Sequence, residues 1–396
     1  SFPTRRSSDL IFTILIIMFS NISSLKTDST SSIKDVMSFI SSQLLPDIRP
    51  RQIKVYTGID WDYLMIPSVS KYLFEELEVV ENLAPVGQVN RPGNVYDKYY
   101  ICVHDTGDHS YGAKFWSDVV KTAKIGKRDY VSSFQYVVGN DGYYHMIPDN
   151  EIAFHAGDGH TEESIFGIIP SGVFINKMKK EKPKIEIDEE GYYLINGVKS
   201  TIKSPTNDKG EILKTEDIND LGIYSELRKV DNQENTYEYY LGRTWYNPTF
   251  TKISNFGGNL NSIGIETCVN VNSDVYYSWQ KVAKLVARLM EDNNLTIDAV
   301  VQHHYFSGKD CPETKRHAGL WEYFKTVVLV EYQMLQYKKE GYTFEFKSNS
   351  ELVNEKGRII KAVDEETIVE YTITVKDKDG NTLEEKFNSY IYPKES

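Results

Sequence analysis

The chain has 396 residues, of which 40% are hydrophobic, and its 57 acidic and 45 basic side chains give a formal net charge of -12. This length allows two domains, or one large domain with additions, and the composition is typical of a folded protein rather than a disordered one. The acidic balance argues against nucleic acid as a partner, because phosphate contacts need a basic surface.

The N-terminal residues predict export. Arg5 and Arg6 precede an apolar run from Leu10 to Phe19, and Ser- and Thr-rich sequence follows. A membrane-spanning helix needs about 20 apolar residues, so this shorter run is typical of the central part of a signal peptide. We therefore expect residues 1–32 to be a signal-like segment and a linker.

Residues 33–95 predict a helical extension. Apolar side chains recur at helical spacing from Ile33 to Leu44, before Pro46. The stretch from Val69 to Leu83 is interpreted as a second helix that ends before Pro85.

The next segment predicts strands, with a histidine at one strand end. Tyr99 to Val103 is an unbroken apolar run that leads into His104, which indicates a buried strand. Asn140-Asp141-Gly142 lies between the apolar segments 133–138 and 143–147 and predicts a hairpin turn. The other expected elements are a strand at 261–269, an amphipathic helix at 279–290, a short strand at 299–302 and a helix at about 320–337.

Two segments differ from this pattern. The stretch from 160 to 256 is polar and charge-rich, and we interpret it as an insertion within a main domain at 96–340. From Tyr342 onward, apolar and polar residues alternate strictly, with a turn at Asp379-Gly380. Residues 341–396 therefore predict a small all-β module that resembles immunoglobulin-like domains.

The segment QHHYFSGKDCPE, residues 302–313, carries an imidazole, a lysine and a thiol on one loop. Zinc takes nitrogen and sulfur ligands tetrahedrally, and a catalytic zinc site keeps three protein ligands and one open position. Pro312 restricts the backbone beside Cys311. The loop therefore suits zinc, and the strand-terminal His104 is the best candidate for a further ligand. The chain has three cysteines, Cys102, Cys268 and Cys311, and three are too few for a disulfide framework.

Four motifs occur in order along the chain: VHDTG, FQYVVGNDGYYHMIPDNEIAFHAGDG, NSIGIE and HHYFSGKDCP. Together they resemble the zinc N-acetylmuramoyl-L-alanine amidases of the type 2 family, which are related to peptidoglycan recognition proteins and phage amidases. The resemblance covers about residues 95–335. It implies an α/β fold, with a central mixed β-sheet flanked by helices, in a protein that is secreted to the cell wall.

The resemblance also implies one zinc ion per chain, bound by His104, His303 and Cys311. The second histidine of the family lies eight residues before the cysteine, which selects His303 over His304, and His304 is interpreted as a surface or supporting group. The rival interpretation makes Cys311 the nucleophile of a cysteine hydrolase. It is disfavoured, because a zinc-bound thiolate is not free to attack.

Further residues take roles from the same resemblance. Glu266 matches a general base, with structural support of the strand end as its alternative. In other relatives a tyrosine serves near the water, but Phe134 stands there and has no ionisable group. Lys309 matches a cation near the scissile carbonyl, with an ordinary exposed lysine as its alternative. His155 matches a histidine that contacts substrate rather than metal, and for Asp105 both a supporting role and a turn role remain open.

The implied activity is hydrolysis of the amide bond between N-acetylmuramic acid and L-alanine in bacterial peptidoglycan. The alternative is a non-catalytic peptidoglycan-binding module, because some relatives hold peptidoglycan without cutting it. Those relatives typically lack the cysteine ligand, which is Cys311 in this chain. For the module at 341–396 we expect contact with the cell wall or a spacer role.

Overall fold

The structure is a computed structural model, and it describes residues 31–43, 71–156, 168–177, 183–204, 210–212, 214–215, 225–242, 258–271, 273–307, 311–391 and 393. The expected signal-like run at 10–19 and the expected catalytic Lys309 lie outside these residues. Within the described part of the chain, no helix has the length and apolar character that a membrane crossing requires.

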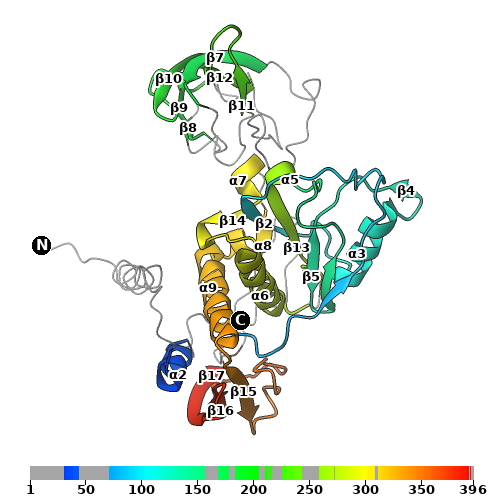
Figure 1. The fold of residues 1–396 in the computed structure, drawn as a ribbon, viewed down its shortest axis with the longest axis vertical. Helices are drawn as coiled ribbons and strands as arrows, with labels where there is room; N and C mark the ends of the chain where they lie inside the picture. The colour runs from blue at the N-terminus through cyan, green and yellow to red at the C-terminus, as the bar shows by residue number, and fades with distance from the viewer. Residues whose placement is uncertain are drawn as a thin grey trace, which may run out of the picture.

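A six-stranded mixed sheet forms the centre of the main domain (Figure 1). Its strands, in spatial order, are β1 (Val79–Glu81), β6 (Gly142–His145), β5 (Tyr136–Gly139), β13 (Ser262–Thr267), β2 (Tyr100–Asp105) and β14 (Val300–Gln302). Strands β5 and β6 form the expected antiparallel hairpin, and the other neighbours in the sheet are parallel. The expected α/β architecture with a central mixed sheet is therefore confirmed.

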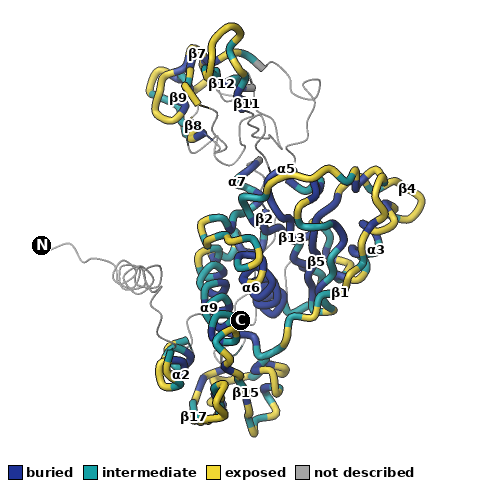
Figure 2. The backbone as a smooth tube through the Cα atoms, viewed as in Figure 1, coloured by how far each residue is buried: buried dark blue, intermediate teal, exposed yellow. Residues whose placement is uncertain are grey.

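Helices cover both faces of this sheet. Helices α6 (Val275–Asp292) and α9 (Trp321–Lys339) pack on one face, and α3 (Ala113–Thr122) packs on the other. Successive strand residues point to opposite faces, so Val138 joins the core with α6 while Val137 joins the core with α3. Figure 2 shows α6 and the central strands as the most deeply buried part of the domain.

Short elements connect these layers. They are the β3–β4 hairpin (Lys124–Ile125 and Arg128–Asp129), α5 (Gly258–Asn261), the 3-10 helix η2 (Ile297–Ala299), α7 (His304–Ser307) and α8 (Glu313–His317). Helix α5 leads directly into β13, whereas α7 and α8 follow β14. The candidate zinc ligands come from the carboxyl ends of β2 and β14 and from Cys311, which lies just before α8.

The expected helix from Val69 to Leu83 is wrong over the residues that the structure describes. Residues 71–78 contain no helix, and the next three residues form the edge strand β1, which pairs with β6. The β-branched pair Val79 and Val80 favours an extended chain, and Val79 packs against the core. A run of alternating glutamate and apolar residues therefore has the period of a strand here, not that of a helix.

The stretch predicted as an insertion contains a folded β unit. Two antiparallel sheets form it, one from β8 (Ile185–Ile187), β9 (Tyr192–Ile195) and β10 (Val198–Lys203), and one from β7 (Ile168–Ile175), β12 (Tyr237–Gly242) and β11 (Ser225–Lys229). Tyr193 and Leu241 are fully buried within it. The unit lies at the end of the main domain where α5 and α7 are found (Figure 1). Its buried side chains belong to one apolar cluster with Cys102, Ala156 and Phe306 of the main domain, despite the polar composition of this stretch.

The C-terminal module is a three-stranded antiparallel sheet of β15 (Thr343–Ser348), β16 (Thr367–Lys376) and β17 (Thr382–Ile391). The predicted alternation is confirmed, because β16 buries every second side chain. The expected helix at 33–44 is also confirmed as α2 (Ile33–Ser42), and it packs on this sheet through Met37 and Ile40. An immunoglobulin-like sandwich needs a second sheet, and the described C-terminal residues form one sheet, so that finer expectation is not confirmed.

Replacing Ile373 of β16 by alanine should lower the free energy of unfolding of this module by about 2–5 kcal/mol, because the side chain is fully buried between α2 and the sheet. Ile368→Ala in the same strand is the control. Its side chain is 57% exposed, and we expect a change within about 1 kcal/mol. Urea denaturation measures both, and equal losses would contradict the packing described here.

Candidate metal centre

Three parallel strands end at one edge of the central sheet. His104 is the penultimate residue of β2, Glu266 occupies the same position in β13, and His303 directly follows β14. The register pairs Glu266 with His104. Because Ile101 and Val103 face the core under α6 and α9, alternation turns His104 to the opposite face, and it does the same for Glu266.

His104, His303 and Cys311 come together at this edge. Their ligand atoms all lie within 4.8 Å of one another, and all three residues are buried. The Sγ of Cys311 lies 3.7 Å from Nδ1 of His104, and the rings of His104 and His303 are 4.6 Å apart between centroids. The structure therefore brings the three predicted ligands to one point.

The spacing of these atoms fits a tetrahedral ion. Bond lengths of about 2.1 Å to nitrogen and 2.3 Å to sulfur, with tetrahedral angles, set the sulfur and nitrogen about 3.6 Å apart. The measured 3.7 Å between Cys311 and His104 agrees with this value. Two imidazoles and one thiol are also a donor set that zinc prefers. These residues can hold a zinc ion, and Nδ1 is the ligand nitrogen that His104 would offer.

Glu266 lies beside this cluster. Its Oε1 is 3.8 Å from Nδ1 of His104, and its side chain is 15% exposed. A carboxylate at this place is near enough to the ligand atoms to contact a molecule that occupies an open position on the metal. Lys309, the other predicted catalytic residue, lies outside the described residues.

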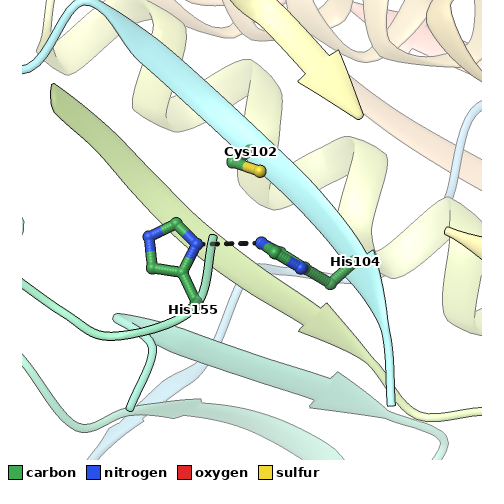
Figure 3. A group of neighbouring side chains, drawn as sticks. All are labelled: Cys102, His104 and His155. Atoms are coloured by element: carbon green, nitrogen blue, oxygen red, sulfur yellow. Dashed lines mark hydrogen bonds between the residues drawn. The ribbon is translucent and has the colours of Figure 1, made fainter. Parts of the chain in front are cut away.

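His155 contacts His104 directly. Its Nδ1 lies 2.9 Å from Nε2 of His104 (Figure 3). Asn259 of α5 holds the backbone at His155 in place, since its Oδ1 accepts hydrogen bonds from the backbone N–H groups of His155 and Ala156. The sequence predicted a substrate contact for His155, and the structure places its ring against a candidate metal ligand.

The protonation of this histidine pair follows from its surroundings. Burial lowers the pKa of His155 to about 3, and the charge of Lys98 adds to the effect. His155 is therefore neutral near pH 7. If Nδ1 of His104 keeps a lone pair for a metal, its Nε2–H donates the hydrogen bond to Nδ1 of His155.

A second group of possible ligands shares His104. Cys102, His104 and His155 also have ligand atoms within 4.8 Å of one another (Figure 3). The two groups share His104, and Nε2 of that residue already contacts Nδ1 of His155. The sequence analysis missed Cys102 as a neighbour of the site, although its place two residues before His104 in a strand puts it on the same face.

Gly264 makes room for His155. A Cβ atom at this position in β13 would lie 2.7 Å from Cγ and Cδ2 of the His155 ring. The glycine in the motif SIGIE therefore allows the imidazole to lie flat against the sheet and reach His104.

Gly264→Ala should displace His155 and lower the free energy of unfolding by about 1–3 kcal/mol, because the added methyl group overpacks a buried contact. Gly107→Ala is the matched control, since no atom outside its chain neighbours lies within 4 Å of its Cβ position. Thermal or urea unfolding compares the two variants. Equal stability of both would contradict the close approach of His155 to β13.

Residues 96–193 match the family model described as N-acetylmuramoyl-L-alanine amidase. The N-acetylmuramoyl-L-alanine amidase XlyA of Bacillus subtilis (strain 168) is 22% identical over 250 residues, which cover 63% of this chain and 50% of XlyA. The N-acetylmuramoyl-L-alanine amidase CwlA of the same organism is 26% identical over 159 residues, or 36% of this chain and 57% of CwlA. The chain thus spans about half the length of these relatives.

A solved structure of the catalytic domain of XlyA aligns with 64% of this chain and 99% of that domain, at 20% identity and a TM-score of 0.36. The family resemblance predicted from the four motifs is confirmed by the match at residues 96–193.

Proposed function

Since residues 96–193 match the family model described as N-acetylmuramoyl-L-alanine amidase, we propose that the chain belongs to the type 2 family of these amidases and hydrolyses the amide bond between N-acetylmuramic acid and L-alanine in peptidoglycan. One zinc ion per chain is bound by His104, His303 and Cys311. The observation that carries the proposal is the buried cluster of these residues beside Glu266. The protein is secreted, and it acts at the cell wall.

A zinc ion held by these three residues would act as a Lewis acid and would lower the pKa of a bound water to about 7. Glu266 accepts the proton of the attacking water and passes it to the L-alanine nitrogen as the amide bond breaks. Its position supports this role, because its carboxylate lies 3.8 Å from the ligand nitrogen of His104. Lys309 stabilises the negative charge that develops on the carbonyl oxygen.

For His155 we propose orientation of His104 in addition to the contact with substrate expected from its motif. The 2.9 Å hydrogen bond supports orientation, because it fixes both the ring and the tautomer of a ligand histidine. Substrate contact requires an open approach to the ring, and Nε2 of His155 is buried. The described geometry therefore supports orientation of His104 better than contact with substrate.

The alternative, a module that binds peptidoglycan without cutting it, needs neither a metal nor a base. Binding alone does not require a thiol and two imidazoles that lie within 4.8 Å of one another beside a carboxylate. This arrangement favours the enzyme. Contact of the C-terminal sheet with the cell wall stays a prediction.

Digestion of purified cell wall by the protein should release new amino termini of L-alanine without new reducing sugars, because the amidase leaves the glycan strand intact. Glu266→Gln should lower kcat by about 10²- to 10⁴-fold, since it removes the proton acceptor but keeps the shape of the side chain. Amino-terminal labelling of the soluble products measures both. New reducing sugars without new L-alanine termini would contradict the proposed bond.

His303→Ala should bind less than one zinc ion per chain and lose activity, because it removes one of three protein ligands. His304→Ala is the matched control, since it removes the adjacent imidazole, which is not part of the cluster. Elemental analysis of the two purified variants and of the unmodified protein gives the zinc content. Loss of zinc from His304→Ala alone would reverse the assignment of the ligand.

A further inference from the structure

Lys315 is a lysine with no exposed surface, four residues after Cys311 in α8. Its Nζ donates hydrogen bonds to Oδ1 of Asp105 at 3.1 Å and to Oγ1 of Thr267 at 3.3 Å. The aromatic rings of Trp279 and Phe324 lie on its apolar side, 5.1 and 5.2 Å from Nζ. The ammonium group therefore lies deep inside the domain, between the sheet and its covering helices.

Asp105 binds α8 through both of its oxygens. Oδ1 accepts from Lys315, and Oδ2 accepts from the backbone N–H of Thr314 at 2.7 Å and from its hydroxyl at 2.6 Å. The Asp105 side chain is only 2% exposed. The sequence left a supporting role and a turn role open for this residue, and these contacts give it the supporting role.

These contacts connect the segments that carry the site. Asp105 directly follows His104, Thr267 directly follows Glu266, and Thr314 lies three residues after Cys311. One lysine thus links the ends of β2 and β13 to the loop that presents the thiol. The Sγ of Cys311 itself lies 3.9 Å from the backbone oxygen of Asp105.

The charges around Lys315 fit this position. Burial has the largest effect on Lys315 and lowers its pKa, although the negative charges of Asp105, Cys311 and Glu266 oppose this shift. The acidic groups around the lysine all belong to the site or adjoin it.

Stability alone does not account for such a pair. The cost of removing two charges from water offsets most of their attraction, and apolar replacements of buried ion pairs are often neutral or stabilising. A metal site, in contrast, needs its ligands held within about 0.5 Å of their bound positions. Resting on the zinc site proposed above, we propose that Lys315 and Asp105 form a positioning pair that holds His104 and Cys311 at ligand spacing before the metal binds.

The test uses the double variant Asp105→Asn/Lys315→Met in the full chain, which removes both charges and leaves neither buried alone. We expect its zinc affinity, measured by competition with a chromophoric chelator, to fall by about 10- to 100-fold, as for other groups that orient metal ligands. Zinc affinity is the readout because a purely structural pair would not change it.

The chain offers a matched control in a second buried pair, Lys284 and Glu331, which joins α6 to α9. Their Nζ and Oε2 atoms are 2.8 Å apart, and the side chains are 9% and 1% exposed. Glu331 lies ten residues into α9, about 15 Å along the helix from its start. Lys284→Met/Glu331→Gln should change thermal stability and leave zinc affinity as in the unmodified protein.

A milder pair of variants keeps the test open if the double variant does not fold. Thr314→Val removes one hydrogen bond to Asp105 and should weaken zinc binding by a few fold, while Thr314→Ser should restore it. Equal zinc affinity in the Asp105/Lys315 variant and the control pair, or in all Thr314 variants, would overturn the positioning role. Absence of zinc binding in the unmodified protein would instead overturn the proposed function itself.

Discussion

The parallel pairing of β2 with β13 is the constraint on which the candidate site depends. Its register sets Glu266 beside His104, and strand alternation turns both side chains away from the apolar core under α6. Strand β14 pairs with the other side of β2 and brings His303 to the same edge. A slip of one residue would turn His104 into that core. Backbone hydrogen bonds between strands therefore fix His104, Glu266 and His303, while the loop before α8 supplies the third candidate ligand, Cys311.

Around this frame, the candidate ligand His104 is held from two sides. His155 bonds its Nε2, and Gly264 gives the His155 ring the space to do so. On the other side, Asp105, the residue after His104 in β2, accepts a hydrogen bond from Lys315 of α8. A ligand held by such contacts would lose little freedom on binding a metal, because its ring is already restricted by its neighbours.

Much of this could be predicted from the sequence, where local patterns determine the structure. The Asn140-Asp141-Gly142 turn and the alternation around Ile373 specify their elements through backbone geometry and burial, and the motifs named three residues, His104, His303 and Cys311, that the structure brings together. The helix expected from Val69 was wrong, because pairing with β6 favours an extended edge strand there. The burial of Lys315 could not be predicted, because α8 is polar by composition and the lysine is removed from water by packing against Trp279 and Phe324, which lie far from it in the sequence or on another helix.

The packing of α2 on the C-terminal sheet joins the two ends of the described chain. The backbone N–H of Ser31 bonds the carboxylate of Glu340, 309 residues further along, and Met37 completes the core under β16. A growing chain makes α2 early, yet the surface that covers its apolar side exists only after the last strands have been synthesised. Short helices are marginal in water on their own, and contacts this distant in sequence form late. The core that α2 shares with the C-terminal sheet is therefore complete only after β17 has been synthesised.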